Sequence, residues 1–243
     1  MCQHCDVTAS AQTSRRQLMI GAISLAASVA LGPRVLAKEA KPPPKPQNAL
    51  PPDAALDRLM KGNTRYIDGV SRRHDFKHER EALAGGQNPF AGILSCADSR
   101  IAPEYAFDSG RGDLFVCRVA GNFASDEMVA SLEYAVSALN VPLFMVLGHD
   151  SCGAVDAAIK SLKDSTTLPG HLPSLVRALA PAVKATEGKP GDQLANAIRQ
   201  NVIDNITRLK SATPILSAAV DQGKLKVVGG IYRLGDGKVE LLV

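Results

Sequence analysis

The sequence has no tryptophan and only five cysteines among its 243 residues. Three of the cysteines, Cys96, Cys117 and Cys152, lie beyond residue 52. An odd and small number of cysteines is a poor framework of disulfide bonds, even in an exported protein. The thiols of these three residues are therefore expected to be free or to be held by something other than a disulfide.

Most of the chain also has no excess of positive or negative charge. Residues 1–52 contain six of the 28 Lys and Arg residues and two of the 24 Asp and Glu residues, which leaves 28 − 6 = 22 basic and 24 − 2 = 22 acidic residues in 53–243. A neutral domain has no basic patch for nucleic acid or for an anionic membrane surface. Neither is expected as a partner.

The apolar stretch from Leu18 to about Leu31 is shorter than the roughly 20 residues that a membrane-spanning helix needs. It follows Arg15 and Arg16 and leads to small residues that end at Ala37, a layout typical of a signal peptide. Ser-Arg-Arg-Gln-Leu resembles the twin-arginine export signal. We predict a signal peptide over 1–37 and a bacterial periplasmic or secreted protein with no stable membrane anchor after cleavage. An amphipathic transit peptide or an N-terminal anchor helix is the alternative.

Two further features precede the main domain. Cys2, His4 and Cys5 form a C-x-H-C cluster, which we interpret as incidental because it lies upstream of the predicted cleavage site. Residues 38–52 are rich in proline and are expected to form an extended linker outside any core. One domain is then predicted over residues 53–243.

Helix-like and strand-like segments alternate through this domain. Helices are predicted over 53–67, 125–139, 152–163, 173–183 and 191–210, with a short helix before Gly85-Gly86 and a helical turn over 102–108. Strands are predicted over 91–95, 113–119 and 142–148, and a Gly-Asp-Gly turn joins two more over 225–231 and 238–242. The third run is apolar throughout, as in strands buried on both faces. The predicted fold class is therefore α/β, with a mostly parallel central β-sheet flanked by helices.

Two short motifs stand where strand-like runs end. Cys96, Asp98 and Arg100 follow the first predicted strand, and His149 and Cys152 follow the third. Ligands in open parallel sheets collect at the carboxyl ends of strands, so adjacent strands would bring Cys96, His149 and Cys152 together. Two thiolates and an imidazole are a good donor set for tetrahedral Zn²⁺. Either motif alone fits a core histidine or a buried cysteine; the two together predict a metal site. Cys117, by contrast, is predicted to be a buried strand residue.

C-A-D-S-R, followed about fifty residues later by H-D-S-C-G, resembles the β-class carbonic anhydrases. The resemblance covers most of 53–243 and includes G-G-Q-N-P, R-V-A-G-N and S-L-E-Y-A-V between residues 85 and 136. It implies a zinc enzyme with one Zn²⁺ per subunit. The implied reaction is the reversible hydration of carbon dioxide to bicarbonate and a proton.

The same resemblance implies roles for the motif residues. Cys96, His149 and Cys152 match the zinc ligands, and the fourth position is taken by water or by the carboxylate that matches Asp98. Arg100 matches the residue that pairs with this carboxylate and draws it off the metal, so Asp98 and Arg100 are the expected catalytic residues. Zinc lowers the pKa of bound water from near 15.7 to about 7. The sequence leaves open whether Asp98 binds the metal or Arg100 at rest.

Four further residues match the family's substrate pocket. They are Gln87, Gly153, Phe115 and Tyr134, and the last two come from the partner subunit in the family, so a homodimer or a higher homo-oligomer is expected. Ordinary core or interface packing is the alternative for the two aromatic residues. Some members hold a noncatalytic bicarbonate in a pocket lined by tryptophan, and this chain is predicted to lack that pocket. Arg111 is assigned no role.

Two other functions fit the same residues. The first is hydrolysis of CS₂ or COS on the same scaffold, because these molecules resemble CO₂ in shape. The second is a catalytically silent zinc-binding module. Asp98, Arg100 and Gln87 argue against a silent module, because such a protein has no need of them.

Overall fold

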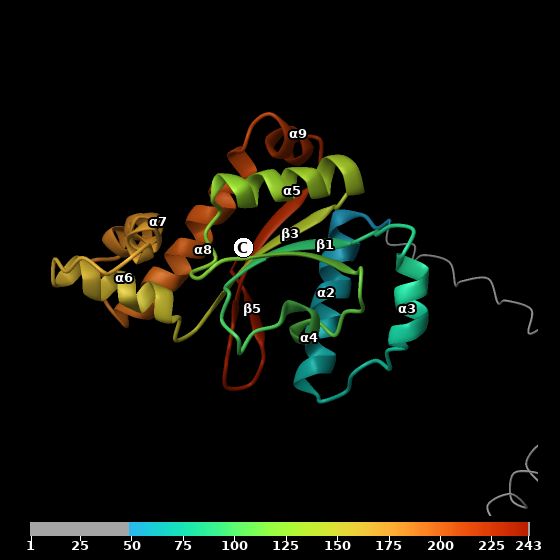
Figure 1. The fold of residues 1–243 in the computed structure, drawn as a ribbon, viewed down its shortest axis with the longest axis horizontal. Helices are drawn as coiled ribbons and strands as arrows, with labels where there is room; N and C mark the ends of the chain where they lie inside the picture. Colours follow the sequence, from blue (N-terminus) through green and yellow to red (C-terminus); the bar gives the residue numbers. More distant parts are fainter. Residues whose placement is uncertain (1–48, 243) are drawn as a thin grey trace, which may run out of the picture. The chain divides into compact units, whose positions relative to one another are not determined.

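The computed structural model describes residues 49–242. The predicted signal peptide and most of the proline-rich linker lie outside these residues. The helices are α2 (Pro52–Ile67), α3 (Phe76–Leu83), α4 (Pro103–Ala106), α5 (Asp126–Leu139), α6 (Gly153–Lys163), α7 (Leu172–Ala185), α8 (Gln193–Ser211) and α9 (Ile215–Asp221). The strands are β1 (Ala91–Ser95), β2 (Leu114–Arg118), β3 (Leu143–His149), β4 (Lys226–Tyr232) and β5 (Val239–Leu241) (Figure 1).

The strands form one sheet in the order β2-β1-β3-β4-β5. The pairs β1–β2, β1–β3 and β3–β4 are parallel, and β4–β5 is antiparallel. The predicted α/β class with a mostly parallel sheet is therefore confirmed. The order places β1 beside β3, so the ends of the two strands that carry the motifs are neighbours.

Buried side chains lie on both faces of the sheet. Along β3, Leu143, Met145 and Leu147 pack in a cluster with residues of α2 and α4. The alternate residues, Phe144 and Val146, pack in a second cluster with residues of α5, α8 and α9. Figure 1 shows these two sets of helices on opposite sides of the sheet. This two-sided burial explains why the strand is apolar throughout.

Local sequence explains where several helices begin and end. Ser125 and Asp192 accept hydrogen bonds from backbone N–H groups in the first turns of α5 and α8. The turn predicted over 102–108 is helical only from Pro103 to Ala106, because Asp108 takes a left-handed conformation with φ of 40°. None of the helices described between residues 49 and 242 is long and apolar enough to cross a membrane.

One prediction concerns the close packing of α2. A Cβ added at Gly62 would lie 1.9 Å from the Phe107 carbonyl oxygen. Gly62→Ala is therefore expected to lower the free energy of unfolding by about 2 kcal/mol, as overpacking typically does. Gly85→Ala is the control, because a Cβ there meets nothing within 4 Å. Urea unfolding of both variants tests this, and equal midpoints would contradict the close approach.

Candidate metal centre

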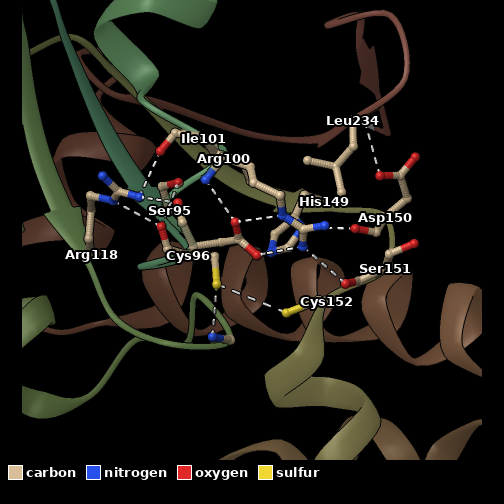
Figure 2. Close-up of polar contacts among 12 residues, drawn as sticks. Ser95, Cys96, Arg100, Ile101, Arg118, His149, Asp150, Ser151, Cys152 and Leu234 are labelled. Atoms are coloured by element: carbon tan, nitrogen blue, oxygen red, sulfur yellow. Dashed lines mark hydrogen bonds and ion pairs between the residues drawn. The ribbon is translucent and has the colours of Figure 1, made fainter.

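The ends of β1 and β3 bring three metal-binding side chains together. Cys96 follows β1, His149 ends β3, and Cys152 directly precedes α6. One ligand atom from each residue lies within 4.8 Å of the other two, and the two sulfur atoms are 4.0 Å apart (Figure 2). The three residues are 4%, 0% and 1% exposed. Within the described chain, no other group of His, Cys, Asp or Glu residues meets the same geometric test.

The His149 ring is oriented for metal binding. Its Nδ1 lies 2.8 Å from the Asp150 carbonyl oxygen, which can only accept a hydrogen bond. Nδ1 therefore carries the proton, and Nε2 presents its lone pair to the two thiols. Nε2 is buried and has no hydrogen-bond partner within residues 49–242. A buried acceptor left without a donor beside two thiols fits a metal ion, and this donor set fits zinc.

The two thiols influence each other's ionisation. The nearby Cys152 thiol lowers the pKa of Cys96. The same contact and burial raise the pKa of Cys152. A divalent cation at this point would favour the thiolate form of both residues.

Asp98 and Arg100 form a bidentate ion pair beside the three ligands. Arg100 donates from Nε to Asp98 Oδ1 at 2.9 Å and from Nη2 to Oδ2 at 2.7 Å. The guanidinium holds the pKa of Asp98 well below its usual range. Asp98 Oδ2 lies 3.9 Å from His149 Nε2. The structure therefore has Asp98 paired with Arg100, which is one of the two arrangements that the sequence left open.

Most of this chain is similar to known proteins in sequence and in structure. Residues 91–239 match the family model described as carbonic anhydrase. Carbonic anhydrase 2 of Mycobacterium tuberculosis is 39% identical over 191 residues, which is 78% of this chain and 92% of that protein. The chain belongs to the β-class carbonic anhydrase family. The carbonic anhydrase of Mycolicibacterium smegmatis is 36% identical over 191 residues, 78% of this chain and 93% of that protein. The structure of the β-carbonic anhydrase CcaA matches with 28% identity and a TM-score of 0.59, over 76% of this chain and 94% of that one.

The C-A-D-S-R loop of this carbonic anhydrase is anchored by Arg118, a residue to which the sequence alone assigned no role. Arg118, the last residue of β2, donates from Nε to the Cys96 carbonyl at 2.9 Å. It also donates from Nη2 to the carbonyls of Asp98 and Ile101, both at 2.7 Å. Three bonds from one guanidinium fix the loop between the first ligand and the Asp98–Arg100 pair (Figure 2). In the sequence, Arg118 was visible only as the first residue of R-V-A-G-N, and this motif does not show which groups the arginine contacts.

Asp150 was also overlooked as a positioning residue. Its Oδ1 accepts a hydrogen bond from the Leu234 backbone N–H at 3.0 Å, and its own N–H donates to the Tyr232 carbonyl at 3.2 Å. Both bonds restrain Asp150, whose carbonyl orients His149. The segment after β4 therefore helps to set the direction of the imidazole ring.

The four predicted pocket residues fall into two groups. Gly153 is the residue after Cys152 and begins α6. Gln87 precedes the start of β1, Phe115 pairs with Gly92 near that start, and the Tyr134 ring lies 6.4 Å from the Phe115 ring. Gly92 is four residues before Cys96, so at roughly 3.3 Å per strand residue Phe115 is more than about 10 Å from Cys96. One chain therefore brings Gly153 to the ligands but leaves Phe115, with Tyr134 beside it, near the start of β1.

Two remaining residues lie outside the metal group. Cys117 pairs with Leu94 inside the sheet and is 7% exposed, and burial raises the pKa of its thiol. The prediction of a buried strand residue is confirmed. Arg111 lines a cavity of about 850 Å³ together with residues of α2 and α4, none of which belongs to the metal group.

Proposed function

We propose that this chain catalyses the reversible hydration of carbon dioxide to bicarbonate and a proton, with zinc held by Cys96, His149 and Cys152. One observation carries the proposal: three buried donor atoms from two strand ends lie within 4.8 Å of one another. Three protein ligands leave a fourth position open, which is the arrangement of catalytic zinc sites. When bound, Zn²⁺ acts as a Lewis acid and lowers the pKa of a bound water molecule to about 7.

Asp98 and Arg100 prepare the attacking water in this proposal. The carboxylate lies 3.9 Å from the His149 nitrogen, so it borders the position that the ligands leave open. Arg100 lowers the pKa of Asp98, and the carboxylate therefore stays ionised at neutral pH. An ionised carboxylate accepts a hydrogen bond from the water and turns its lone pair toward the carbon of CO₂. The proton released by the reaction passes to solvent, because the Asp98 carboxylate, with its lowered pKa, is too weak a base to retain it.

The substrate pocket is proposed to be completed by a second copy of the chain. Phe115 is paired with Gly92, too far from the metal ligands of its own chain to contact the same substrate, and Tyr134 packs beside Phe115. Gln87 lies before the strand that Cys96 follows. Tyr134 is 53% exposed, and β2 is an edge strand of the sheet. A homodimer or a higher homo-oligomer that covers this edge would place the three side chains at the partner's site. Analytical ultracentrifugation tests this, and an active monomer would contradict it.

Gly153 is proposed to leave room for the substrate. A Cβ added there meets nothing within 4 Å in the chain, so the fold does not require glycine. Gly153→Ala is expected to leave the melting temperature unchanged and to lower kcat/KM for CO₂ about tenfold, mainly through KM. Gly235→Ala, at another open position in the turn before β5, is the control. An unchanged KM in Gly153→Ala would remove Gly153 from the pocket.

Export is the second part of the proposal. Arg15 and Arg16 precede an apolar stretch that ends with small residues at Ala37, which supports a twin-arginine signal peptide over 1–37 and a periplasmic or secreted enzyme. Residues 38–52 would then be a linker before the 53–243 domain. Mass spectrometry of the protein from its bacterial host should give a mature chain that starts at Lys38. Full-length protein in the cytoplasm would contradict this.

Stopped-flow measurement of CO₂ hydration by the zinc-loaded mature protein tests the proposed reaction. Turnover well above the buffer rate is expected, and a rate equal to that of buffer would overturn the proposal in favour of a silent zinc-binding module. COS and CS₂ are measured alongside as competing substrates. Faster turnover of either one than of CO₂ would identify the hydrolase instead.

A further inference from the structure

Two buried asparagines of α8 bind the loop that joins β2 to α5. Asn201 and Asn205 are 2% and 7% exposed. Asn205 Oδ1 accepts from the Ala124 N–H at 2.7 Å, and Asn201 Nδ2 donates to the Gly121 carbonyl at 2.8 Å. Asn205 Nδ2 also donates to Asn201 Oδ1 at 3.0 Å. Since buried amides are costly unless hydrogen-bonded, this network fixes both the loop and the rotamer of Asn201.

The loop held by these asparagines contacts a proposed zinc ligand. The Gly121 N–H donates to Cys96 Sγ at 3.3 Å. Gly121 has φ of 86°, and a Cβ added there would lie 2.9 Å from Leu179. Glycine is therefore the residue that lets the backbone approach the sulfur. The N–H and the carbonyl of Gly121 flank one Cα, so the bond from Asn201 to the carbonyl restrains the residue whose N–H donates to the sulfur.

We propose that Asn201 is a positioning residue that holds the Gly121 N–H against the Cys96 sulfur and thereby tunes this ligand. The inference rests on the proposed function, because it assumes that Cys96 binds the metal. A hydrogen bond to a thiolate draws electron density away from the sulfur, so the ligand donates less charge to the metal. The acidity of the bound water depends on the positive charge of the metal, which two negative thiolates offset. A site with two thiolates therefore gains most from a hydrogen bond that withdraws electron density from sulfur.

The experiment uses the protein loaded with Co²⁺, whose thiolate-to-metal absorption band reports the electron density on sulfur. In Asn201→Asp and Asn201→Ser, neither new side chain donates as the amide does, and the band is expected at longer wavelength than in the wild type. Zinc affinity is expected to fall about tenfold or more, because the loop no longer holds Cys96 in its binding orientation. Asn196→Asp is the matched control, because Asn196 lies on the same helix and donates to the Pro190 carbonyl at 3.1 Å. It should leave band and affinity unchanged.

A measurement on the wild type keeps the inference testable if the variants do not fold. In protein loaded with ¹¹³Cd, the Gly121 amide proton should show scalar coupling to the metal through the N–H···S bond. A resolved Gly121 amide without coupling, or a folded Asn201 variant with the wild-type band, would overturn the inference. Failure of the wild-type protein to bind Co²⁺ or Cd²⁺ would overturn the proposed function instead. None of these readouts depends on CO₂ turnover.

Discussion

Replacing Cys152 with serine is expected to abolish zinc binding and to reduce CO₂ hydration to the rate of buffer. The Cys152 side chain is buried, and its sulfur lies 4.0 Å from that of Cys96. A serine hydroxyl does not ionise near neutral pH and is a poor ligand for zinc, so only two protein ligands would remain. Zinc content by mass spectrometry of the purified variant measures the effect, and less than a tenth of an equivalent per chain is expected.

Cys117→Ser is the matched control for this experiment. Cys117 is also buried, but it lies in β2 and outside the group of three ligands. Cys117→Ser makes the same exchange of sulfur for oxygen. The variant should therefore retain one zinc per chain, even where it lowers the free energy of unfolding. If both variants keep stoichiometric zinc, Cys152 is not a ligand. If both lose it, the loss reflects damage to the fold and not to the metal site.

Asp98→Asn is expected to retain zinc and to lower kcat/KM about a hundredfold or more, the range usual for loss of a positioned proton acceptor. An amide offers Arg100 one acceptor where the carboxylate offers two, and its NH₂ group cannot accept the hydrogen bond of the attacking water. Stopped-flow hydration together with the zinc content measures both parts of the prediction.

Asp156→Asn is the control for the loss of a carboxylate. Asp156 pairs with Lys160 at 2.6 Å on α6, and its side chain is not part of the group of metal-binding residues. It should retain wild-type kcat/KM, since exposed ion pairs contribute little. Wild-type turnover in Asp98→Asn would show that the Asp98 carboxylate has no catalytic role. Loss of zinc from this variant would show that the carboxylate is needed for metal binding.

The sheet could be predicted from the sequence because its central strands are unusually regular. β1 was predicted over the residues that form it, and β3 begins one residue later than predicted. The strands are apolar runs bounded by Gly and Pro, and this signal is local. The convergence of Cys96, His149 and Cys152 followed from one rule about strand ends. α9 was not predicted, because it is only seven residues long and no side chain caps its start.

The supporting contacts of the site could not be predicted, because they join residues far apart in the chain. Arg118 reaches three carbonyls between residues 96 and 101, and Asn201 binds a carbonyl 80 positions away. Such bonds follow no periodicity and depend on the final packing of α8 and β2.

Zinc K-edge X-ray absorption of the purified protein shows directly whether the three side chains share one metal ion. One zinc is expected with two sulfur neighbours near 2.3 Å and two nitrogen or oxygen neighbours near 2.0–2.1 Å, the distances usual for these ligands. One of the lighter neighbours is His149, and the other fills the fourth position. A shell without sulfur, or one with four sulfur atoms, would contradict the meeting of Cys96, His149 and Cys152 around a single ion.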